Sequence, residues 1–152
     1  MKSHYKNLFN YNHWANDLCL QGLENAVSPP PKTLSLFSHI LSAQLIWLNR
    51  ISDLPIAPFP IWEEYNLREL RSMVEEGTER WLKFIDNYPN DNFGEVINYI
   101  NTKGNKYNSS VLDIITHIIN HGTYHRGQIA LLMRQSELNP AVTDYIVHQR
   151  NI

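Results

Sequence analysis

The chain has 152 residues, of which 43% are hydrophobic and 18% charged. This length and composition predict one globular domain, residues 1–152, and exclude a disordered or fibrous protein. There are 13 Lys and Arg against 15 Asp and Glu, a formal net charge of -2, and the sequence has no basic run or stripe. We therefore do not expect nucleic acid as a partner.

Membrane insertion and cysteine chemistry are also restricted by the sequence. No apolar run approaches the roughly 20 residues that a membrane span needs, and the opening MKSHYKNLFNYNHW has no signal-peptide core. We expect no membrane partner and a cytoplasmic protein. Cys19 is the only cysteine, which excludes an internal disulfide and a zinc site built from several cysteines. Any metal ion would have to be held by nitrogen and oxygen atoms.

Two amphipathic helices are predicted in the first third of the chain. Between Ser3 and about Ala26 apolar residues recur at spacings of three and four, and SPPPK then breaks the pattern. The second helix is expected to begin near Thr33 and to carry apolar side chains on one side as far as Ile51. The three prolines of SDLPIAPFP then end it.

The middle of the chain predicts a third helix and a short extended segment. NLRE, residues 66–69, has the Asn-x-x-Glu form of a helix N-terminal capping box, and the periodic pattern continues to DNYPND. Gly77 within it costs about 1 kcal/mol relative to alanine, which is too little to reverse the prediction. The segment FGEVINYINTKGNKYN has β-branched and aromatic residues on both sides of a Lys-Gly-Asn turn, so we expect a small hairpin or an ordered loop.

The longest periodic stretch runs from Val111 to about Gln135, behind a capping pattern formed by Ser110 and Asp113. Asn139-Pro140 ends it, and the apolar residues of the tail TDYIVHQRNI are expected to cover one end of the core. Four amphipathic helices without a sustained strand pattern predict an all-α chain that folds as a four-helix bundle.

The stretch HGTYHRGQ, residues 121–128, places two histidines four residues apart on the last helix. On a helical wheel His121 and His125 fall within or at the edge of the apolar arc, so both rings are expected to point inward. Each unsatisfied polar group in a core costs roughly 1 to 3 kcal/mol, whereas a metal ion would satisfy both rings. Side chains at i and i+4 stand one above the other, so both can turn a nitrogen toward the same ion.

A metal site needs a further ligand from another helix, and His39 is the best candidate. It lies beside the apolar arc of the second helix, in LFSHILSAQLIW. Three histidines with an open coordination position are typical of a catalytic metal ion, and zinc, nickel, iron or copper would accept such nitrogens. The Glu of the zinc-protease His-Glu-x-x-His signature is absent. The alternative, core or surface histidines satisfied by hydrogen bonds, stays open.

Other polar and aromatic residues have simpler expected roles. His117, nearer the margin of the apolar arc, is expected to be structural or to contact a ligand rather than to bind the metal. Arg126 and Gln128 are expected on the flanks of the last helix, and Cys19 in the core. Three histidines near the termini are expected to be exposed or interfacial: His4, His13 and His148. Three tryptophans are expected in the core: Trp14, Trp47 and Trp81.

Three stretches together resemble the DinB/YfiT-like family of metalloenzymes, the damage-inducible group and not the DNA polymerase of similar name. They are HIINHGTYHRGQIALLMRQ, LFSHILSAQLIWLNRI and NPAVTDYIVHQR, and the most specific element is His-x-x-x-His-Arg-Gly-Gln. The resemblance covers nearly the whole chain. It implies a four-helix bundle of up-down-down-up connectivity, a homodimer, and a divalent metal ion held by His39, His121 and His125. His117 matches a position that is frequently histidine in the family.

The resemblance leaves the reaction open. The wider superfamily includes thiol S-transferases and an isomerase that use low-molecular-weight thiols, beside many members without an assigned reaction. We expect a metal-dependent enzyme acting on a small molecule, with transfer of a low-molecular-weight thiol as the first hypothesis and zinc or nickel, then iron or manganese, as the metal. A metal-dependent hydrolase and a non-enzymatic, stress-related metal-binding dimer remain alternatives. Outward-facing Tyr124 and Leu131 are candidates for a dimer interface.

Overall fold

The structure is a computed structural model of the chain, and it describes residues 1–52, 61–89, 92–101 and 103–150. These residues are mostly helical, with one small two-stranded sheet. The elements in chain order are α1 (Lys2–Asn25), α2 (Pro31–Ile51), α3 (Leu67–Asn87), β1 (Val96–Ile100), β2 (Lys106–Ser110), α4 (Val111–Gln135) and α5 (Tyr145–Arg150). The expectation of a mainly helical chain is confirmed.

Helices α3 and α4 begin where a side chain accepts a hydrogen bond from one of their first backbone N–H groups. At the start of α3 the Asn66 side chain accepts a hydrogen bond from the Glu69 backbone N–H, and the Glu69 carboxylate accepts one from the Asn66 N–H, as the capping box predicts. At the start of α4 the Ser110 hydroxyl accepts from the Asp113 N–H. The second helix begins at Pro31, two residues before the predicted start, because proline suits the first helical turn.

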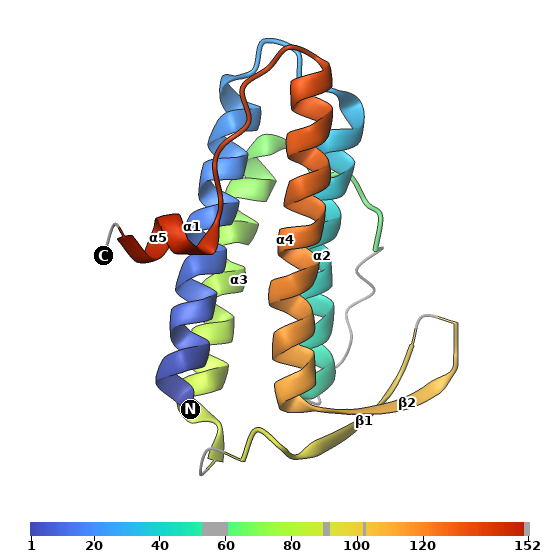
Figure 1. Cartoon of the computed structure of the whole chain (residues 1–152). Helices are drawn as coiled ribbons and strands as arrows, with labels where there is room; N and C mark the ends of the chain where they lie inside the picture. The colour runs from blue at the N-terminus through green and yellow to red at the C-terminus, as the bar shows by residue number, and fades with distance from the viewer. Residues whose placement is uncertain (53–60, 90–91, 102, 151–152) are drawn as a thin grey trace.

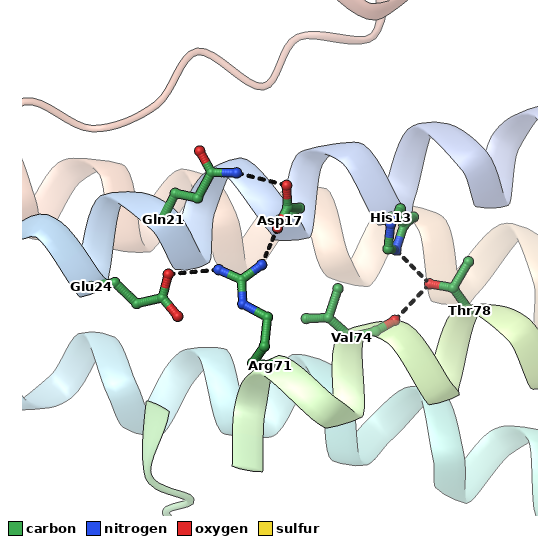
Figure 2. Close-up of polar contacts among 7 residues, drawn as sticks. All are labelled: His13, Asp17, Gln21, Glu24, Arg71, Val74 and Thr78. Atoms are coloured by element: carbon green, nitrogen blue, oxygen red, sulfur yellow. Dashed lines mark hydrogen bonds and ion pairs between the residues drawn. The ribbon is translucent and has the colours of Figure 1, made fainter. Parts of the chain in front are cut away.

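The four long helices lie side by side (Figure 1). Helices α1 and α4 run upward in this view, and α2 and α3 run downward. The most extensive contacts join α1 to α3 and α2 to α4. Between α1 and α3, Arg71 forms ion pairs with Asp17 and Glu24 (Figure 2). The helices thus pack as two closely joined pairs.

The core is formed by the inward faces of these four helices. Trp81 is fully buried, stacks on Phe9 with ring centroids 4.7 Å apart, and donates its indole hydrogen bond to the Gln44 carbonyl. The other two tryptophans expected in the core, Trp14 and Trp47, are only partly buried and pack against the buried core residues. None of the described helices combines the length and the apolar character that crossing a bilayer requires.

The segment between α3 and α4 forms the small hairpin that the sequence predicted as one of two alternatives. Strands β1 and β2 pair antiparallel, with Val96 opposite Ser110 and Ile100 opposite Lys106. Gly104 adopts a φ of 83° in the connection, a conformation that side-chain-bearing residues rarely adopt. Strand β2 runs directly into α4, and Tyr99 of β1 packs against Trp47 of α2.

The C-terminal tail differs from the expectation that it covers one end of the core. Helix α5 instead crosses α1 near its middle (Figure 1). The Tyr11 hydroxyl donates to the Thr143 carbonyl, and the Tyr11 ring contacts Tyr145 edge-on at 5.1 Å. Ile146 remains 55% exposed. The aromatic side chains of α1 give the tail a docking site on the side of the helices, which a pattern of apolar residues in the tail alone cannot predict.

Candidate metal centre

Three histidines from α2 and α4 converge at the interface between these helices. The Nε2 atom of His121 lies 3.1 Å from Nε2 of His39 and 3.1 Å from Nε2 of His125. The ligand atoms of all three residues lie within 4.8 Å of one another. His39 is 82 residues from His121 in the sequence, so the packing of α2 against α4 creates this cluster.

The spacing of the three Nε2 atoms suits a metal ion. Histidine nitrogens bind zinc at about 2.0–2.1 Å. Two such nitrogens that subtend angles between 90° and 109° at the ion are then about 2.9–3.4 Å apart. The two separations of 3.1 Å fall inside this interval. These two separations are therefore compatible with nitrogens that share one ion.

Hydrogen bonds on the far side of two rings orient their Nε2 atoms. The His39 Nδ1 atom lies 2.9 Å from the Ile61 carbonyl oxygen, and the His125 Nδ1 atom lies 2.7 Å from the Gln128 side-chain oxygen. Because both oxygens only accept hydrogen bonds, each Nδ1 carries the hydrogen and each Nε2 presents a lone pair. If His121 Nε2 carries a hydrogen, that hydrogen can bond to only one of these two lone pairs. A cation could accept a lone pair from the Nε2 atom of each of the three rings.

The electrostatic surroundings favour neutral histidines, the form that binds metal ions. Burial, together with the neighbouring His125, His39 and His117 rings, lowers the pKa of His121 to about 3. Burial likewise lowers the pKa of His39. At neutral pH these two rings are therefore uncharged.

Two exposed aromatic side chains flank the cluster. The Trp62 ring stacks on His39 with centroids 3.9 Å apart and planes within 4°, and 53% of its surface is exposed. The Tyr124 ring lies 5.1 Å from that of His125 and is 65% exposed. Trp62 could not be identified from the sequence, because it lies outside any periodic helical pattern. Gln128 was expected on a flank of the last helix in an ion pair or an interface, although its i+3 spacing from His125 was a usable signal for this contact.

The other histidines lie outside the cluster. His117 is exposed, and its ring lies beside those of Trp47 and His121, both with centroids 5.4 Å away. His13 hydrogen bonds to Thr78 on the side where α1 meets α3 (Figure 2). His148 packs against Trp14, and His4 is exposed.

Arg126 is buried, which corrects the expectation that it lies on a flank of α4. Its side chain is 3% exposed, and Nη1 donates to the side-chain oxygens of Asn12 and Asn16 at 2.8 and 2.7 Å. Long helical side chains turn toward the preceding turn, and here that turn contains Gly122. A Cβ atom on Gly122 would lie 2.9 Å from Nη1, so the glycine leaves room for the guanidinium group. The helical wheel could not show this local space.

The lone cysteine takes no part in the site. Cys19 is buried in the core, as expected, and burial raises the pKa of its thiol to about 12. The thiol is therefore protonated at neutral pH and does not act as a nucleophile.

Comparison with known proteins gives a family match over nearly the whole chain. The chain is 25% identical over 155 residues to Protein DinB of Bacillus subtilis (strain 168), a match that covers 91% of this chain and 89% of that protein. The model of the DinB family matches residues 1–151, a range that includes both histidine-bearing helices. The earlier resemblance is thereby confirmed over nearly the whole sequence, and the chain belongs to the DinB family.

Proposed function

We propose that this chain is a metal-dependent enzyme that holds one divalent cation through His39, His121 and His125. The observation that carries the proposal is the convergence of three Nε2 atoms from two helices, with pairs 3.1 Å apart. The hydrogen bonds from Ile61 and Gln128 support it, because they turn the lone pairs of two rings toward the same point. An all-nitrogen ligand set favours zinc or nickel, with iron or manganese as alternatives.

The chemistry follows from three protein ligands and an open coordination position. A divalent cation lowers the pKa of a thiol or water molecule that it binds. The protein residues would fix the position of the reacting atom and, through the exposed rings of Trp62 and Tyr124, provide apolar contacts for the rest of the substrate. We propose a low-molecular-weight thiol as that substrate. Its sulfur loses a proton, forms a bond to an electrophilic carbon, and the leaving group departs.

The direct test is a transfer assay with the metal-loaded protein. Bacillithiol, glutathione and coenzyme A would each be incubated with a generic alkylating electrophile, and loss of free thiol would be followed. We expect at least one thiol to react faster with wild type than with His125→Ala, and we expect His4→Ala, which changes an exposed histidine, to match wild type. Equal rates for wild type and His125→Ala would contradict metal-assisted transfer.

Two other functions use the same cluster. A hydrolase would activate water in place of the thiol, and would be recognised by turnover of an ester or amide without added thiol. A non-enzymatic metal-binding protein of the stress response would lose thermal stability on chelation and show no reaction with any thiol. We place thiol transfer first because the exposed aromatic side chains beside the cluster suit an organic substrate.

We also infer a single-domain four-helix bundle of up-down-down-up connectivity that functions as a homodimer. The directions of the long helices in Figure 1 support the connectivity. The side chain of Leu131 on α4, which is 55% exposed, supports an interface on this helix. Sedimentation should give twice the mass of one chain for wild type and a lower mass for Leu131→Glu. A wild-type monomer would contradict the dimer.

A further inference from the structure

Arg126 is a buried charge that has no carboxylate partner among the described residues, although its Cζ atom lies 5.7 Å from the centroid of the Tyr11 ring. Its Nη1 and Nη2 atoms donate to Asn12, Asn16 and Thr123, all of them neutral. Within the described residues, none of the ion pairs includes Arg126. Buried charges in proteins are ordinarily paired, because neutral hydrogen bonds only partly replace water around the cation. The guanidinium group therefore remains available to an anion.

The surroundings of Arg126 also contain more hydrogen-bond donors than acceptors. The Nε atom of Arg126 and the Nδ2 atoms of Asn12 and Asn16 are buried and have no partner among the described residues. The two asparagine oxygens are already directed at Nη1, so neither amide can turn to supply an acceptor to Nε. An acceptor from outside the protein would satisfy this excess.

A cavity adjoins the guanidinium group. It has a volume of about 540 Å³ and lies between α1, α4 and the segment 141–145 that precedes and begins α5. Both Arg126 and its hydrogen-bond partner Thr123 line it, so Arg126 borders the cavity. Volumes of about 300–1,000 Å³ are typical of sites for small molecules. Gly127 also lines the cavity, and a Cβ atom there would meet no other atom within 4 Å.

The charges around the cavity indicate the ligand. Arg126, Arg134 and Asp144 are the charged residues among its lining, and their formal charges sum to +1. One carboxylate would neutralise this charge, whereas a phosphate dianion would leave an excess of negative charge. Carboxylates also match the planar fork of an arginine. We propose that this cavity is a binding site for a small monocarboxylate, with Arg126 as its anchor. The site lies on the α1 side of α4, separate from the histidine cluster, and does not rest on the proposed function.

The test uses NMR of the arginine Nε–H groups of the full-length protein, with the Arg126 signal assigned from Arg126→Lys. Sodium benzoate is the probe, benzamide is its neutral counterpart, and inorganic phosphate tests the dianion. We expect benzoate to shift the Arg126 signal saturably, benzamide to leave it unchanged, and phosphate to bind more weakly. If phosphate bound as tightly as benzoate or more tightly, the response would be adventitious anion binding and the assignment would be overturned. The absence of a saturable shift with benzoate would also overturn it.

Variants of the lining locate the binding. Gly127→Leu should fill the cavity and weaken benzoate binding at least about tenfold. Thr116→Leu introduces leucine at an exposed position of α4 outside the cavity, and it should not weaken benzoate binding. Binding unaffected by Gly127→Leu would overturn the site.

Charge changes provide a second test that does not depend on cavity filling. Asp144→Asn removes a negative charge and should tighten benzoate binding, and Arg134→Gln should weaken it. Each change should be about fivefold, the effect of one unit charge at about 4 Å in water. Identical affinities in wild type and both variants would show that the charges of the lining do not select the ligand, and would overturn the proposal.

Discussion

At the scale of single residues, the histidine cluster depends on groups that are not ligands. The Gln128 side-chain oxygen holds the His125 ring by its Nδ1 atom at 2.7 Å, and the Ile61 carbonyl does the same for His39 at 2.9 Å. Partners of this kind fix the ring orientation and raise the basicity of the nitrogen that binds the metal. Only the glutamine can be changed by substitution, because the other acceptor belongs to the backbone.

Gln128→Leu should weaken zinc binding by about 10- to 100-fold, the usual effect of losing such a partner. Gln128→Glu keeps an acceptor at this position and should restore most of the affinity. Gln21→Leu is the matched control, because Gln21 is exposed on α1 and contacts Asp17 rather than the cluster. Calorimetric titration measures all four proteins. Unchanged affinity in Gln128→Leu would show that this hydrogen bond does not support the site.

The sequence could predict the three histidines of the cluster but not these partners. His121 and His125 were identifiable because a helix places i and i+4 on one face, and His39 because it lies beside an apolar stripe. The Ile61 carbonyl belongs to a connection whose path no periodic pattern specifies. The role of Arg126 was wrongly predicted because the space above Gly122 depends on the packing of α1.

At the scale of the secondary-structure element, α4 contains two glycines with opposite surroundings. A Cβ atom on Gly122 would lie 2.9 Å from both Arg126 Nη1 and Asn12 Oδ1, two atoms that are hydrogen bonded to each other. A Cβ atom on Gly127 would meet nothing within 4 Å. The same substitution should therefore have opposite effects at these two positions of one helix.

Gly122→Ala should lower the free energy of unfolding by about 1–3 kcal/mol, because the buried hydrogen bonds must shift to admit the methyl group. Gly127→Ala should raise it by up to about 1 kcal/mol, because alanine favours the helix without a clash. Urea unfolding of the metal-free proteins measures both values. Changes of the same sign would contradict the packing described around Arg126.

Helix starts were predictable at this scale, whereas the docking of α5 was not. Asn66 and Ser110 cap their helices through neighbours three residues away, so the local sequence contains the whole interaction. The tail packs on Tyr11, 132 residues from its hydrogen-bond partner Thr143. Apolar residues in a short tail do not indicate which distant surface receives them.

At the scale of the whole molecule, the histidine cluster connects two helices that are far apart in the sequence, α2 and α4. An ion bound there adds bonds between α2 and α4 that an unfolded chain cannot make together. Binding to the folded state alone raises its stability by about 2.7 kcal/mol when the free ion is at 100 times its dissociation constant.

Zinc should therefore raise the melting temperature of wild type by about 5–11 °C under that condition, since 1 kcal/mol corresponds to about 2–4 °C in chains of this size. His121→Ala should not respond, and His13→Ala, whose partner Thr78 lies on another side of the helices, should respond like wild type. Scanning calorimetry with and without zinc measures the shift. Equal shifts in wild type and His121→Ala would place the ion elsewhere.

The central claim is that three histidines from two helices bind one ion, and counting bound ions by calorimetric titration of the metal-free protein tests it most directly. Wild type and His4→Ala should each bind one zinc ion per chain with the same affinity, whereas His39→Ala, His121→Ala and His125→Ala should each lose this binding. Full binding by any of these three variants, or no binding by folded wild type, would contradict the claim.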